Sequence, residues 1–254
     1  MSFTARIRLD GKAAFVTGAA AGIGRATALL FAEQGVGHLV LVDLDAEGLT
    51  TTAQAVEDHE ARTTMSTLNV ADWGAVEQLV ESIGEVDILV NAAGNISSSP
   101  FDVLELSEWQ ATIDSHLKGC FVTSRLLAPG MVERGDGRIV NVASVAGKRG
   151  GGFLGKTAYA AAKAGVDGLT KVTARELAPH GIRVNSVNPG LTDTRRLMPL
   201  REDPSVWERC LAAVPLNREA EPREIANAIV WLASDAATFV TGETMNVDGG
   251  IAME

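Results

Sequence analysis

A glycine-rich loop between a short apolar run and a helix-forming run constrains this chain more than any other feature of its sequence. The run 13–17 is apolar and compatible with a β-strand, the loop 18–24 has the spacing G-x-x-x-G-x-G, and the helix-forming segment after it stops at Gly35. Glycines permit a tight turn and close approach to phosphates, while a helix N-terminus offers free N–H groups. This order predicts a dinucleotide site, the alternative being a loop that only packs helix on strand. The loop residues expected to contact the pyrophosphate are Gly18, Ala21, Gly22, Ile23 and Gly24.

A second apolar run ends in a carboxylate. Residues 39–42 are continuously apolar, as expected of a strand buried on both faces of a parallel sheet, and Asp43 follows them. An acidic residue about 20 positions after the glycine loop accepts hydrogen bonds from an adenosine ribose and repels a 2′-phosphate. Position 21 is Ala and Leu44 follows the acid, so no adjacent Arg or Lys is available to hold such a phosphate. We therefore predict NAD rather than NADP, although a solvated turn residue is the alternative for Asp43.

Apolar strands alternate with helical segments along the whole chain. This alternation predicts an α/β fold, a doubly wound Rossmann-type parallel sheet of about seven strands with helices on both faces. The expected strands are 13–17, 38–43, 62–69, 86–91, 137–143, 182–188 and 244–247. The expected helices are 22–35, 46–58, 72–83, 107–134, 157–179 and 222–234. Right-handed crossovers place the ends of strands one, two, four, five and six along one edge, where a ligand crevice is expected.

The chain has no linker, internal repeat or low-complexity tract, so residues 1–254 are predicted to form a single NAD-binding catalytic domain. The segment at about 191–215 is the one long departure from the α/β alternation. Thr, Asp, Arg and Pro residues at its start are typical of a loop, and we expect it to form a mobile lid over the crevice.

The net charge and the cysteine content limit the binding partners and the cellular compartment that fit this chain. The formal net charge is −10, which argues against nucleic acid or an anionic membrane as a partner. Cys120 and Cys210 have no C-x-x-C spacing or histidine cluster near them, so we expect no disulfide, no metal and a reducing cytoplasm. The segment 1–10 lacks the apolar stretch of a signal peptide, and no run reaches membrane-spanning length.

A phenol and an ammonium lie four residues apart in the helix-forming segment 157–177. Tyr159 and Lys163 are therefore expected on one helix face. An isolated tyrosine ionises near pH ~10, and a fixed cation beside it favours the phenolate. Each unit of such a shift corresponds to about 1.4 kcal/mol, so a few units make Tyr159 an acid/base catalyst near neutrality. Ser144 follows the strand 137–143, where its hydroxyl is able to bond a substrate oxygen; a helix cap is the alternative.

Taken together, these patterns resemble the short-chain dehydrogenase/reductase family from about residue 9 to residue 250. The matching elements are Thr17-Gly18-x-x-x-Gly22-x-Gly24, Asn91-Ala92-Ala93-Gly94, Ser144, Tyr159-x-x-x-Lys163, Asn188-Pro189-Gly190 with Thr194, and Asp248-Gly249-Gly250. The resemblance implies that Tyr159 is the general base in alcohol oxidation and the general acid in carbonyl reduction. It also implies that Lys163 lowers the phenol pKa and holds the nicotinamide ribose, while Ser144 binds the substrate oxygen.

The same resemblance implies further cofactor contacts. Asn69 and Val70 are expected beside the adenine, although the family usually has Asp at position 69. The turn containing Asn91, Ala92 and Gly94 is expected to line the crevice, and Ala92 replaces a second Asn. The remaining expected contacts to the cofactor come from Leu44, Pro189, Gly190, Leu191 and Thr194.

One position departs from the family pattern. Where the family usually has Asn in the sequence Asn-Leu-x-Gly, this chain has His116, within 115–119. The family Asn helps to hold a water molecule linked to the catalytic lysine. An imidazole is also able to bond a water, but it titrates near pH ~6.5 and has one donor when neutral. We weigh a relay role, with extra pH dependence below neutrality, against a buried histidine without one.

The substrate is expected to be a small secondary alcohol or its ketone, with a polyol or sugar alcohol favoured. The loop 148–156 and the residues that follow the Asn91 turn supply mixed polar and apolar pocket walls. One alternative is a 3-oxoacyl thioester (acyl-carrier-protein) reductase, which usually uses NADPH and so is disfavoured by Asp43. Another is a nucleotide-binding relative without catalysis. The resemblance also implies a homotetramer through the long helices 107–134 and 157–179.

Overall fold

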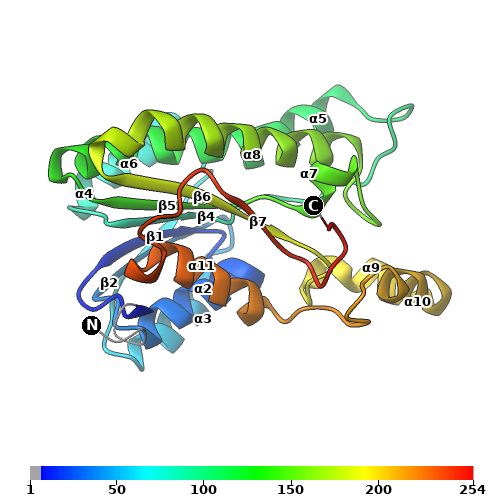
Figure 1. Ribbon diagram of the computed structural model, residues 1–254, viewed down its shortest axis with the longest axis horizontal. Coiled ribbons are helices and arrows are strands. Elements are labelled where there is room, and N and C mark those ends of the chain that lie inside the picture. Colours follow the sequence, from blue (N-terminus) through cyan, green and yellow to red (C-terminus); the bar gives the residue numbers. More distant parts are fainter. Residues whose placement is uncertain (1–6, 254) are drawn as a thin grey trace.

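The computed structural model of the protein describes residues 7–253. Residues 1–6, which belong to the segment 1–10, and residue 254 are part of the predicted domain but lie outside the described residues. A seven-stranded sheet forms the centre, with the order β3-β2-β1-β4-β5-β6-β7 and every pairing parallel (Figure 1). The strands are β1 (Ala13–Thr17), β2 (His38–Asp43), β3 (Arg62–Thr67), β4 (Ile88–Asn91), β5 (Gly137–Val142), β6 (Ile182–Pro189) and β7 (Thr244–Val247). The predicted Rossmann-type fold class is confirmed.

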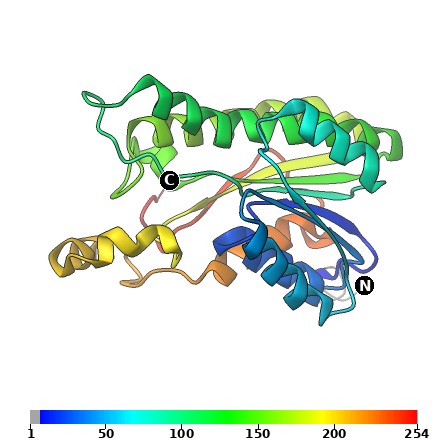
Figure 2. The same ribbon diagram turned by 180° about the vertical axis from the view of Figure 1, so that it is seen from behind.

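Helices cover both faces of this sheet (Figures 1 and 2). One layer consists of α2 (Gly22–Glu33), α3 (Ala46–Glu57) and α11 (Pro222–Ala233). The opposite layer consists of α4 (Trp73–Ile83), α6 (Gly119–Arg134) and α8 (Thr157–Leu177). The chain crosses from one side of β1 to the other between β3 and β4, and ligands bind at such a switch point in doubly wound folds.

The inner strands are apolar because both of their faces are covered. All side chains of β4 and β5 are buried. Val16 packs with Leu41 and Ile229 under the α2–α3–α11 layer, whereas its neighbour Phe15 packs with Met131 under the α4–α6–α8 layer. Successive residues of one strand therefore build the two halves of the core, as the alternation of side chains in a strand requires.

The predicted elements match the observed ones, with shifts at their ends. β3 ends at Thr67 rather than at residue 69, because the chain turns at Asn69, whose side-chain oxygen accepts a hydrogen bond from the Ala71 N–H at 3.0 Å. β4 begins at Ile88 rather than at residue 86. α2 ends at Glu33 rather than at 35, because Gly35 has a φ of +89°, which lies outside the helical region.

The expected helix 107–134 shows the largest difference. It consists of α5 (Leu106–Ile113), a π-helical turn η1 (Asp114–Lys118) and then α6. A π turn accommodates an extra residue and changes the direction of the side chains around it, and such turns are frequent at functional sites. His116 is the central residue of this turn and is buried. A helical sequence period does not reveal where such a turn occurs.

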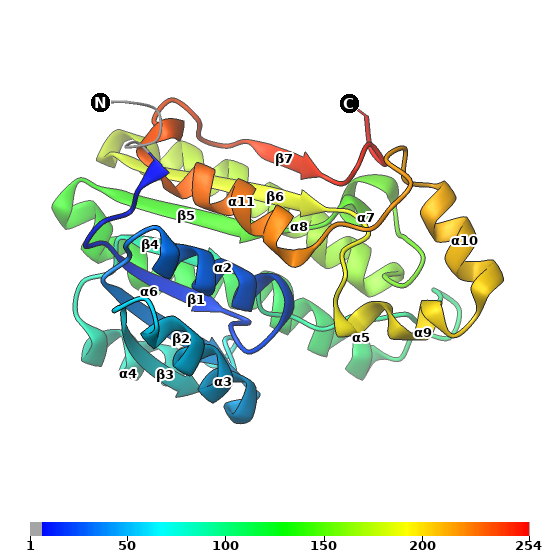
Figure 3. The same ribbon diagram turned by 90° about the horizontal axis from the view of Figure 1, so that it is seen from below.

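The segment predicted as a lid lies beyond the carboxyl ends of the strands, as Figure 3 shows. It contains η3 (Arg195–Leu197), α9 (Met198–Arg201) and α10 (Pro204–Ala212). Leu197, Leu200 and Cys210 are buried together in a small apolar cluster, so the lid has a core of its own. Asp203 caps α10 by accepting a hydrogen bond from the Ser205 N–H at 2.9 Å. The lid is thus a helical unit, and its mobility stays a prediction.

Residues 7–253 contain neither a membrane-spanning helix nor a cluster of metal-ligand side chains. No helix there is long and apolar enough to cross a membrane. No group of three or more His, Cys, Asp or Glu side chains there is arranged to hold a metal ion. Cys120 and Cys210 are both free and buried.

Candidate active site

The glycine loop has the close contacts that require glycine. Gly18 has a φ of +68°, and a Cβ there would lie 2.7 Å from the Ala92 carbonyl oxygen. A Cβ at Gly24 would lie 2.1 Å from the Gly18 oxygen, so α2 starts directly against the loop. No side chain caps the N-terminus of α2 at Ala21, which leaves its first N–H groups available to an anion. The loop therefore fits a cofactor pyrophosphate.

Thr17 joins this loop to the Asn91 turn, a role that the sequence did not suggest. Its hydroxyl accepts hydrogen bonds from the N–H groups of Ala92 at 3.0 Å and Ala93 at 3.1 Å. Asn91 is buried, and its amide donates to the Asn141 side chain at 2.9 Å. The ends of β1, β4 and β5 are thus tied together by polar side chains at the carboxyl edge of the sheet.

Asp43 lies at the end of β2, against the glycine loop. One carboxylate oxygen accepts a hydrogen bond from the Ala20 N–H at 3.0 Å, and the other accepts from the Leu44 N–H at 2.7 Å. No ion pair involving Asp43 occurs within residues 7–253, so its negative charge is not neutralised by a neighbouring cation. Leu44 is 70% exposed beside it. This edge therefore presents a carboxylate where the adenosine of a dinucleotide is expected.

The other expected cofactor contacts lie along the same edge. Val70 is buried and lies against α6, where a Cβ at Gly119 would be 2.6 Å from its Cγ2. Past β6, a Cβ at Gly190 would lie 2.8 Å from the Cα of Asp248, so the segment of Pro189, Gly190 and Leu191 packs tightly on the chain after β7. Thr194 is brought to the glycine loop, since a Cβ at Gly22 would be 3.2 Å from the Thr194 Cγ2.

Ser144, Tyr159 and Lys163 converge at the carboxyl end of β5. Ser144 caps the short helix α7 (Val145–Arg149) by accepting a hydrogen bond from the Ala146 N–H at 3.1 Å, so the cap interpretation is also correct. The Lys163 Nζ donates to the Val142 carbonyl at 2.6 Å and lies 5.7 Å from the centre of the Tyr159 ring. Lys163 is only 4% exposed. The predicted grouping of these three side chains is therefore present in the structure.

The Tyr159 pKa is shifted in the direction opposite to the expected one. Burial raises the pKa of Tyr159, and the opposing effects come from the Arg196 cation and from a hydrogen bond with Ser144. Burial lowers the pKa of Lys163 itself to about 8. The Tyr159 pKa is thus raised rather than lowered, because burial of the phenol outweighs the Arg196 charge and the Ser144 hydrogen bond.

His116 lies directly against the Tyr159 ring. Its ring meets the Tyr159 ring edge to face, with centroids 5.2 Å apart and an angle of 86°. The His116 Nε2 bonds the Asn95 carbonyl oxygen at 2.5 Å, which makes it the protonated nitrogen, and Nδ1 is buried without a partner. Burial, followed by the nearby Lys163 charge, lowers the pKa of His116 well below its usual value. His116 is therefore neutral at pH 7, with an unused acceptor.

Arg196 is a site residue whose place the sequence did not reveal. It belongs to η3 in the lid, and its guanidinium donates a hydrogen bond to the carbonyl oxygen of Gly94. Its positive charge lowers the pKa values of Tyr159, Lys163 and His116. No local pattern signals this contact, because it joins segments about one hundred positions apart in the chain.

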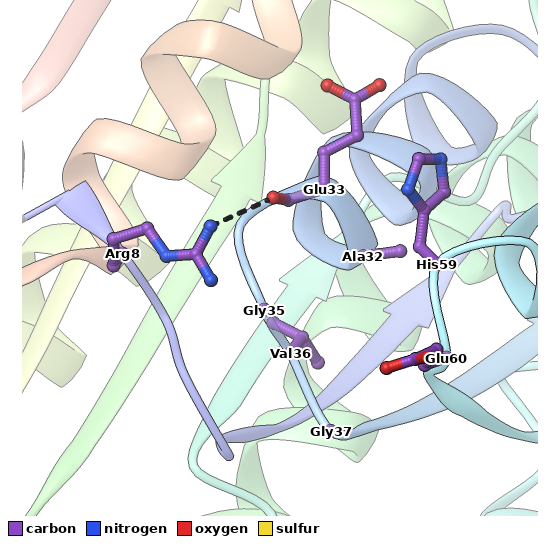
Figure 4. A pocket seen from close by; sticks show the side chains of 8 residues that line it. All are labelled: Arg8, Ala32, Glu33, Gly35, Val36, Gly37, His59 and Glu60. Atoms are coloured by element: carbon purple, nitrogen blue, oxygen red, sulfur yellow. Dashed lines mark hydrogen bonds between the residues drawn. The ribbon is translucent and has the colours of Figure 1, made fainter.

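A polar surface cavity of about 340 Å³ lies at the opposite edge of the sheet (Figure 4). Segments that precede β1, β2 and β3 form its walls, including Arg8, Gly35 and His59. Arg8 donates to the Glu33 carbonyl oxygen at 3.3 Å, which ties the start of the chain to the end of α2. Because it lies at the amino ends of the strands, this cavity is separate from the carboxyl edge where Ser144, Tyr159 and Lys163 meet.

Comparison with known proteins identifies the family. The family model described as Enoyl-(Acyl carrier protein) reductase matches residues 18–252. The chain is 40% identical over 252 residues to the 3-oxoacyl-[acyl-carrier-protein] reductase FabG of Escherichia coli K12, with 97% of this chain and 100% of that protein covered. It is 39% identical over 251 residues to FabG of Thermotoga maritima, with the same coverage of both chains. The chain belongs to the short-chain dehydrogenase/reductase family and is an oxidoreductase of that family.

Solved structures agree on the fold. A putative 2-deoxy-d-gluconate 3-dehydrogenase from Agrobacterium tumefaciens with bound NADP superimposes with a TM-score of 0.90 at 34% identity, covering 97% of this chain and 98% of that one. A putative NAD(P) dependent gluconate 5-dehydrogenase from Beutenbergia cavernae, also with bound NADP, gives a TM-score of 0.91 at 34% identity and the same coverage. Both relatives hold a nicotinamide dinucleotide, the class of cofactor that the glycine loop fits.

Proposed function

We propose that this protein is a nicotinamide-dependent reductase of 3-oxoacyl thioesters, which places the earlier alternative ahead of the polyol dehydrogenase. The observation that carries this proposal is the 40% identity, over essentially the whole chain, to an enzyme named for that reaction. The raised pKa of Tyr159 supports the direction of reduction. A phenol that keeps its proton at neutral pH is a general acid, as carbonyl reduction requires.

The chain's own residues supply binding and proton transfer. Tyr159 donates its phenolic proton to the carbonyl oxygen of the substrate, and the Ser144 hydroxyl binds that oxygen while it becomes negatively charged. Lys163 provides a buried positive charge beside the same centre. The glycine loop, Asp43 and Thr194 hold the cofactor, which supplies the hydride when it is bound.

We also propose NADH rather than NADPH as the reductant. Asp43 carries an unneutralised negative charge against the glycine loop, and a carboxylate there repels a 2′-phosphate. The relatives with bound NADP do not decide this question for the present chain, because cofactor choice depends on local charge at the end of β2. Titration of the protein with NADH and with NADPH measures the preference directly, and tighter binding of NADPH would refute it.

A relay role for His116 also belongs to this proposal. The unpartnered Nδ1 is able to accept a hydrogen bond from a water molecule, and the nearby Lys163 ammonium is a donor for the same water. The alternative remains that His116 only supports the Asn95 loop through Nε2. The acid limb of the pH–rate profile distinguishes these roles, as described below.

A second candidate is oxidation of a small secondary alcohol, in particular a polyol, a sugar alcohol or a related sugar acid. It is favoured by the printed names of two structural relatives, both gluconate-type dehydrogenases at 34% identity. Asp43 favours this candidate as well, because NAD serves oxidation. The third candidate is a nucleotide-binding protein of the same family without catalytic activity.

One assay separates the three. The purified protein is incubated with NADH or NADPH and a 3-oxoacyl thioester, and with NAD or NADP and a panel of polyols and sugar acids, while the absorbance of the reduced cofactor is followed. Faster turnover of the thioester supports the reductase. Faster turnover of an alcohol supports the second candidate, and dinucleotide binding without turnover of any compound supports the third.

We further propose a homotetramer in the cytoplasm. Phe121 of α6 and Val172 of α8 are each 47% exposed on the two long helices expected to form the interface. Both cysteines are free and buried, as in proteins of reducing compartments. Light scattering at micromolar concentration gives the oligomeric state, and a monomeric mass would refute the tetramer.

A further inference from the structure

Asp167 is a buried carboxylate on α8, the helix that carries Tyr159 and Lys163. It is 8% exposed, and it follows Lys163 by four residues as Lys163 follows Tyr159, so the three side chains lie along one face of the helix. Burial raises the pKa of Asp167 and outweighs the hydrogen bonds that oppose this rise. A buried carboxylate costs free energy that an apolar side chain of similar size does not, so the significance of Asp167 lies in the hydrogen bonds that it accepts.

These hydrogen bonds join α8 to the carboxyl end of β6. The Ser186 Oγ donates to the Asp167 Oδ1 at 2.8 Å, and the Asn188 Nδ2 donates to the Asp167 Oδ2 at 3.4 Å. Ser186 and Asn188 are buried, and their side chains point to the same face of the sheet because they are two positions apart in one strand. Within residues 7–253 the Asn188 side chain has no further hydrogen bond, and its Oδ1 is buried without a partner. Asp167 therefore fixes the position of the Asn188 side chain.

The segment 189–191, which follows directly in the chain, lies toward the nicotinamide end of the expected cofactor. Asp43 marks the adenosine end at β2, and the glycine loop after β1 fits the pyrophosphate. In the sheet order, β6 lies on the other side of β1 from β2 and next to β5, whose end carries Ser144. A dinucleotide bound along this edge would therefore have its nicotinamide near Ser144 and the segment 189–191.

The segment 189–191 is bonded to three parts of the molecule. The Gly190 N–H donates to the Val247 carbonyl oxygen at 3.2 Å, and the Leu191 carbonyl oxygen accepts a hydrogen bond from the chain after the lid at 2.8 Å. Toward α8, the hydrogen bonds within residues 7–253 that reach this end of β6 are the two that Asp167 accepts. The segment is thus placed relative to α8 through this carboxylate.

The short helix α7 lies against the same part of α8. A Cβ at Gly147 would lie 2.6 Å from the Ala164 nitrogen, so the backbones of the two helices are in direct contact. Ser144 caps α7, and the positive charge of Lys148 in α7 opposes the rise in the pKa of Asp167. Asp167 therefore lies where the helix of the serine, the helix of the tyrosine and lysine, and the end of β6 meet.

We propose that Asp167 is a positioning residue, which holds the segment 189–191 against α8 and so places the nicotinamide ring relative to Tyr159. This inference rests on the proposed function, because it concerns the dinucleotide of the proposed oxidoreductase. Its physical content, a carboxylate that positions one end of the dinucleotide, does not require turnover of a substrate.

The test compares the binding of NADH with that of ADP-ribose, which lacks the nicotinamide ring. Asp167→Ala removes both hydrogen bonds, Ser186→Ala removes one, and Glu176→Ala is the matched control at an exposed carboxylate of the same helix. Calorimetric titration gives both affinities for each variant. We expect Asp167→Ala to lower the affinity for NADH about tenfold, as for the loss of one or two hydrogen bonds, and to leave the affinity for ADP-ribose unchanged. Ser186→Ala is expected to show a smaller change of the same kind, and Glu176→Ala none.

A purely structural role for Asp167 predicts a different result. Such a role would lower the thermal unfolding midpoint and change the affinities for NADH and ADP-ribose equally or not at all, and either outcome overturns the inference. Should Asp167→Ala not fold, the same comparison in Ser186→Ala decides. Where a substrate turns over, misplacement of the ring is expected to lower kcat by up to about 10²-fold, with a smaller change in KM. A selective loss of NADH affinity in a protein that turns over no substrate overturns the proposed function and leaves the inference standing.

Discussion

Two pairs of cations, one pair at each edge of the sheet, are held in opposite ways. At the amino ends of the strands, Arg138 pairs with Asp136 at 2.5 Å and Asp235 at 3.0 Å, and Lys12 pairs with Asp136 at 3.1 Å. At the carboxyl ends, Lys163 and Arg196 donate to backbone carbonyls instead, and within residues 7–253 neither forms an ion pair. Arg138 and Lys12 at the first edge are thus matched with carboxylates, whereas Lys163 and Arg196 are not.

Because of this difference, we expect the cations at the amino edge to contribute to stability and those at the carboxyl edge to contribute to the reaction. Ion pairs at the amino edge join the starts of β1 and β5 to the end of α11, so their removal is expected to weaken the fold. Uncompensated positive charge at the carboxyl edge is costly to bury, and in the proposed reaction it would stabilise the negative charge that develops on a substrate oxygen. Variants at the amino edge are therefore expected to change the free energy of unfolding, and variants at the carboxyl edge to change turnover or cofactor binding.

The largest effect is expected from Tyr159→Phe, which removes the proton donor and keeps the ring that packs on His116. Loss of general acid catalysis is expected to lower turnover by about 10³-fold, with no comparable change in the thermal unfolding midpoint. Reduced-cofactor absorbance and a thermal melt measure the two quantities. Turnover at the parent's rate would show that another group supplies the proton.

Asp43→Asn tests the charge at the cofactor end of the same edge. The amide oxygen still accepts the Ala20 N–H bond, while the repulsion of a 2′-phosphate is lost, so discrimination against NADPH is expected to fall about tenfold, or ~1.4 kcal/mol. The ratio of Kd values for NADH and NADPH measures this effect. Asp45→Asn, on an exposed carboxylate two residues away, is the control, and equal changes in both variants would contradict the role given to Asp43.

Arg138→Met tests the amino edge. Removing this buried side chain from its two carboxylate partners is expected to lower the free energy of unfolding by about 1–2 kcal/mol, since both partners are substantially exposed, and to leave kcat unchanged. Urea unfolding and the turnover assay measure the two outcomes. A loss of kcat without loss of stability would reverse the assignment of the two edges.

The same variant has a pH signature. Burial acts to raise the pKa of Asp136, but hydrogen bonds and charges from Arg138 and Lys12 bring it below its usual value. A carboxyl with a lowered pKa stabilises the fold above its unfolded-state pKa, and this contribution is lost as the pH falls through the folded-state value. The stability difference between the parent and Arg138→Met is therefore expected to shrink below about pH 4.

The smallest effect is expected from His116→Asn. Because burial keeps His116 neutral in the folded protein, the unfolded chain binds a proton that the folded one does not as the pH falls below about 6.5, and the parent loses stability there. The Asn variant is expected to lack this acid-dependent loss of stability. If His116 relays protons, the parent also loses kcat/KM in the acid limb of its pH–rate profile, and the Asn variant lacks that additional loss. Superimposable acid limbs would dispose of the relay, and His59→Asn, at an exposed histidine, serves as the control.

Local patterns predicted the fold and most of the site, because each depends on residues close in sequence. An apolar run ending in Asp43 specifies both a buried strand and the side chain at its end. Glycine spacing specifies the loop, since Gly18 and Gly24 nearly touch across one turn. The placement of Tyr159 and Lys163 followed from helix geometry in the same way.

Features that depend on distant contacts were not predicted. The π turn around His116 needs only one extra residue, which leaves no mark on the helical period. The Arg196–Gly94 bond joins the lid to the β4 turn, and an arginine in an acidic chain carries no local sign of such a contact. The direction of the Tyr159 pKa was wrong for a similar reason, because desolvation depends on the whole packed site rather than on the spacing of two residues.

The two thiols of the chain lie in different structural units of the molecule. Cys210 belongs to the lid helix α10, whereas Cys120 lies in α6, where burial raises its pKa to about 11. An alkylating reagent reaches either sulfur only after local opening. The rate of Cys210 modification therefore reports opening of the lid, and the rate of Cys120 modification reports opening around α6. One protein sample, alkylated and analysed by mass spectrometry over time, therefore reports on both regions without any introduced cysteine.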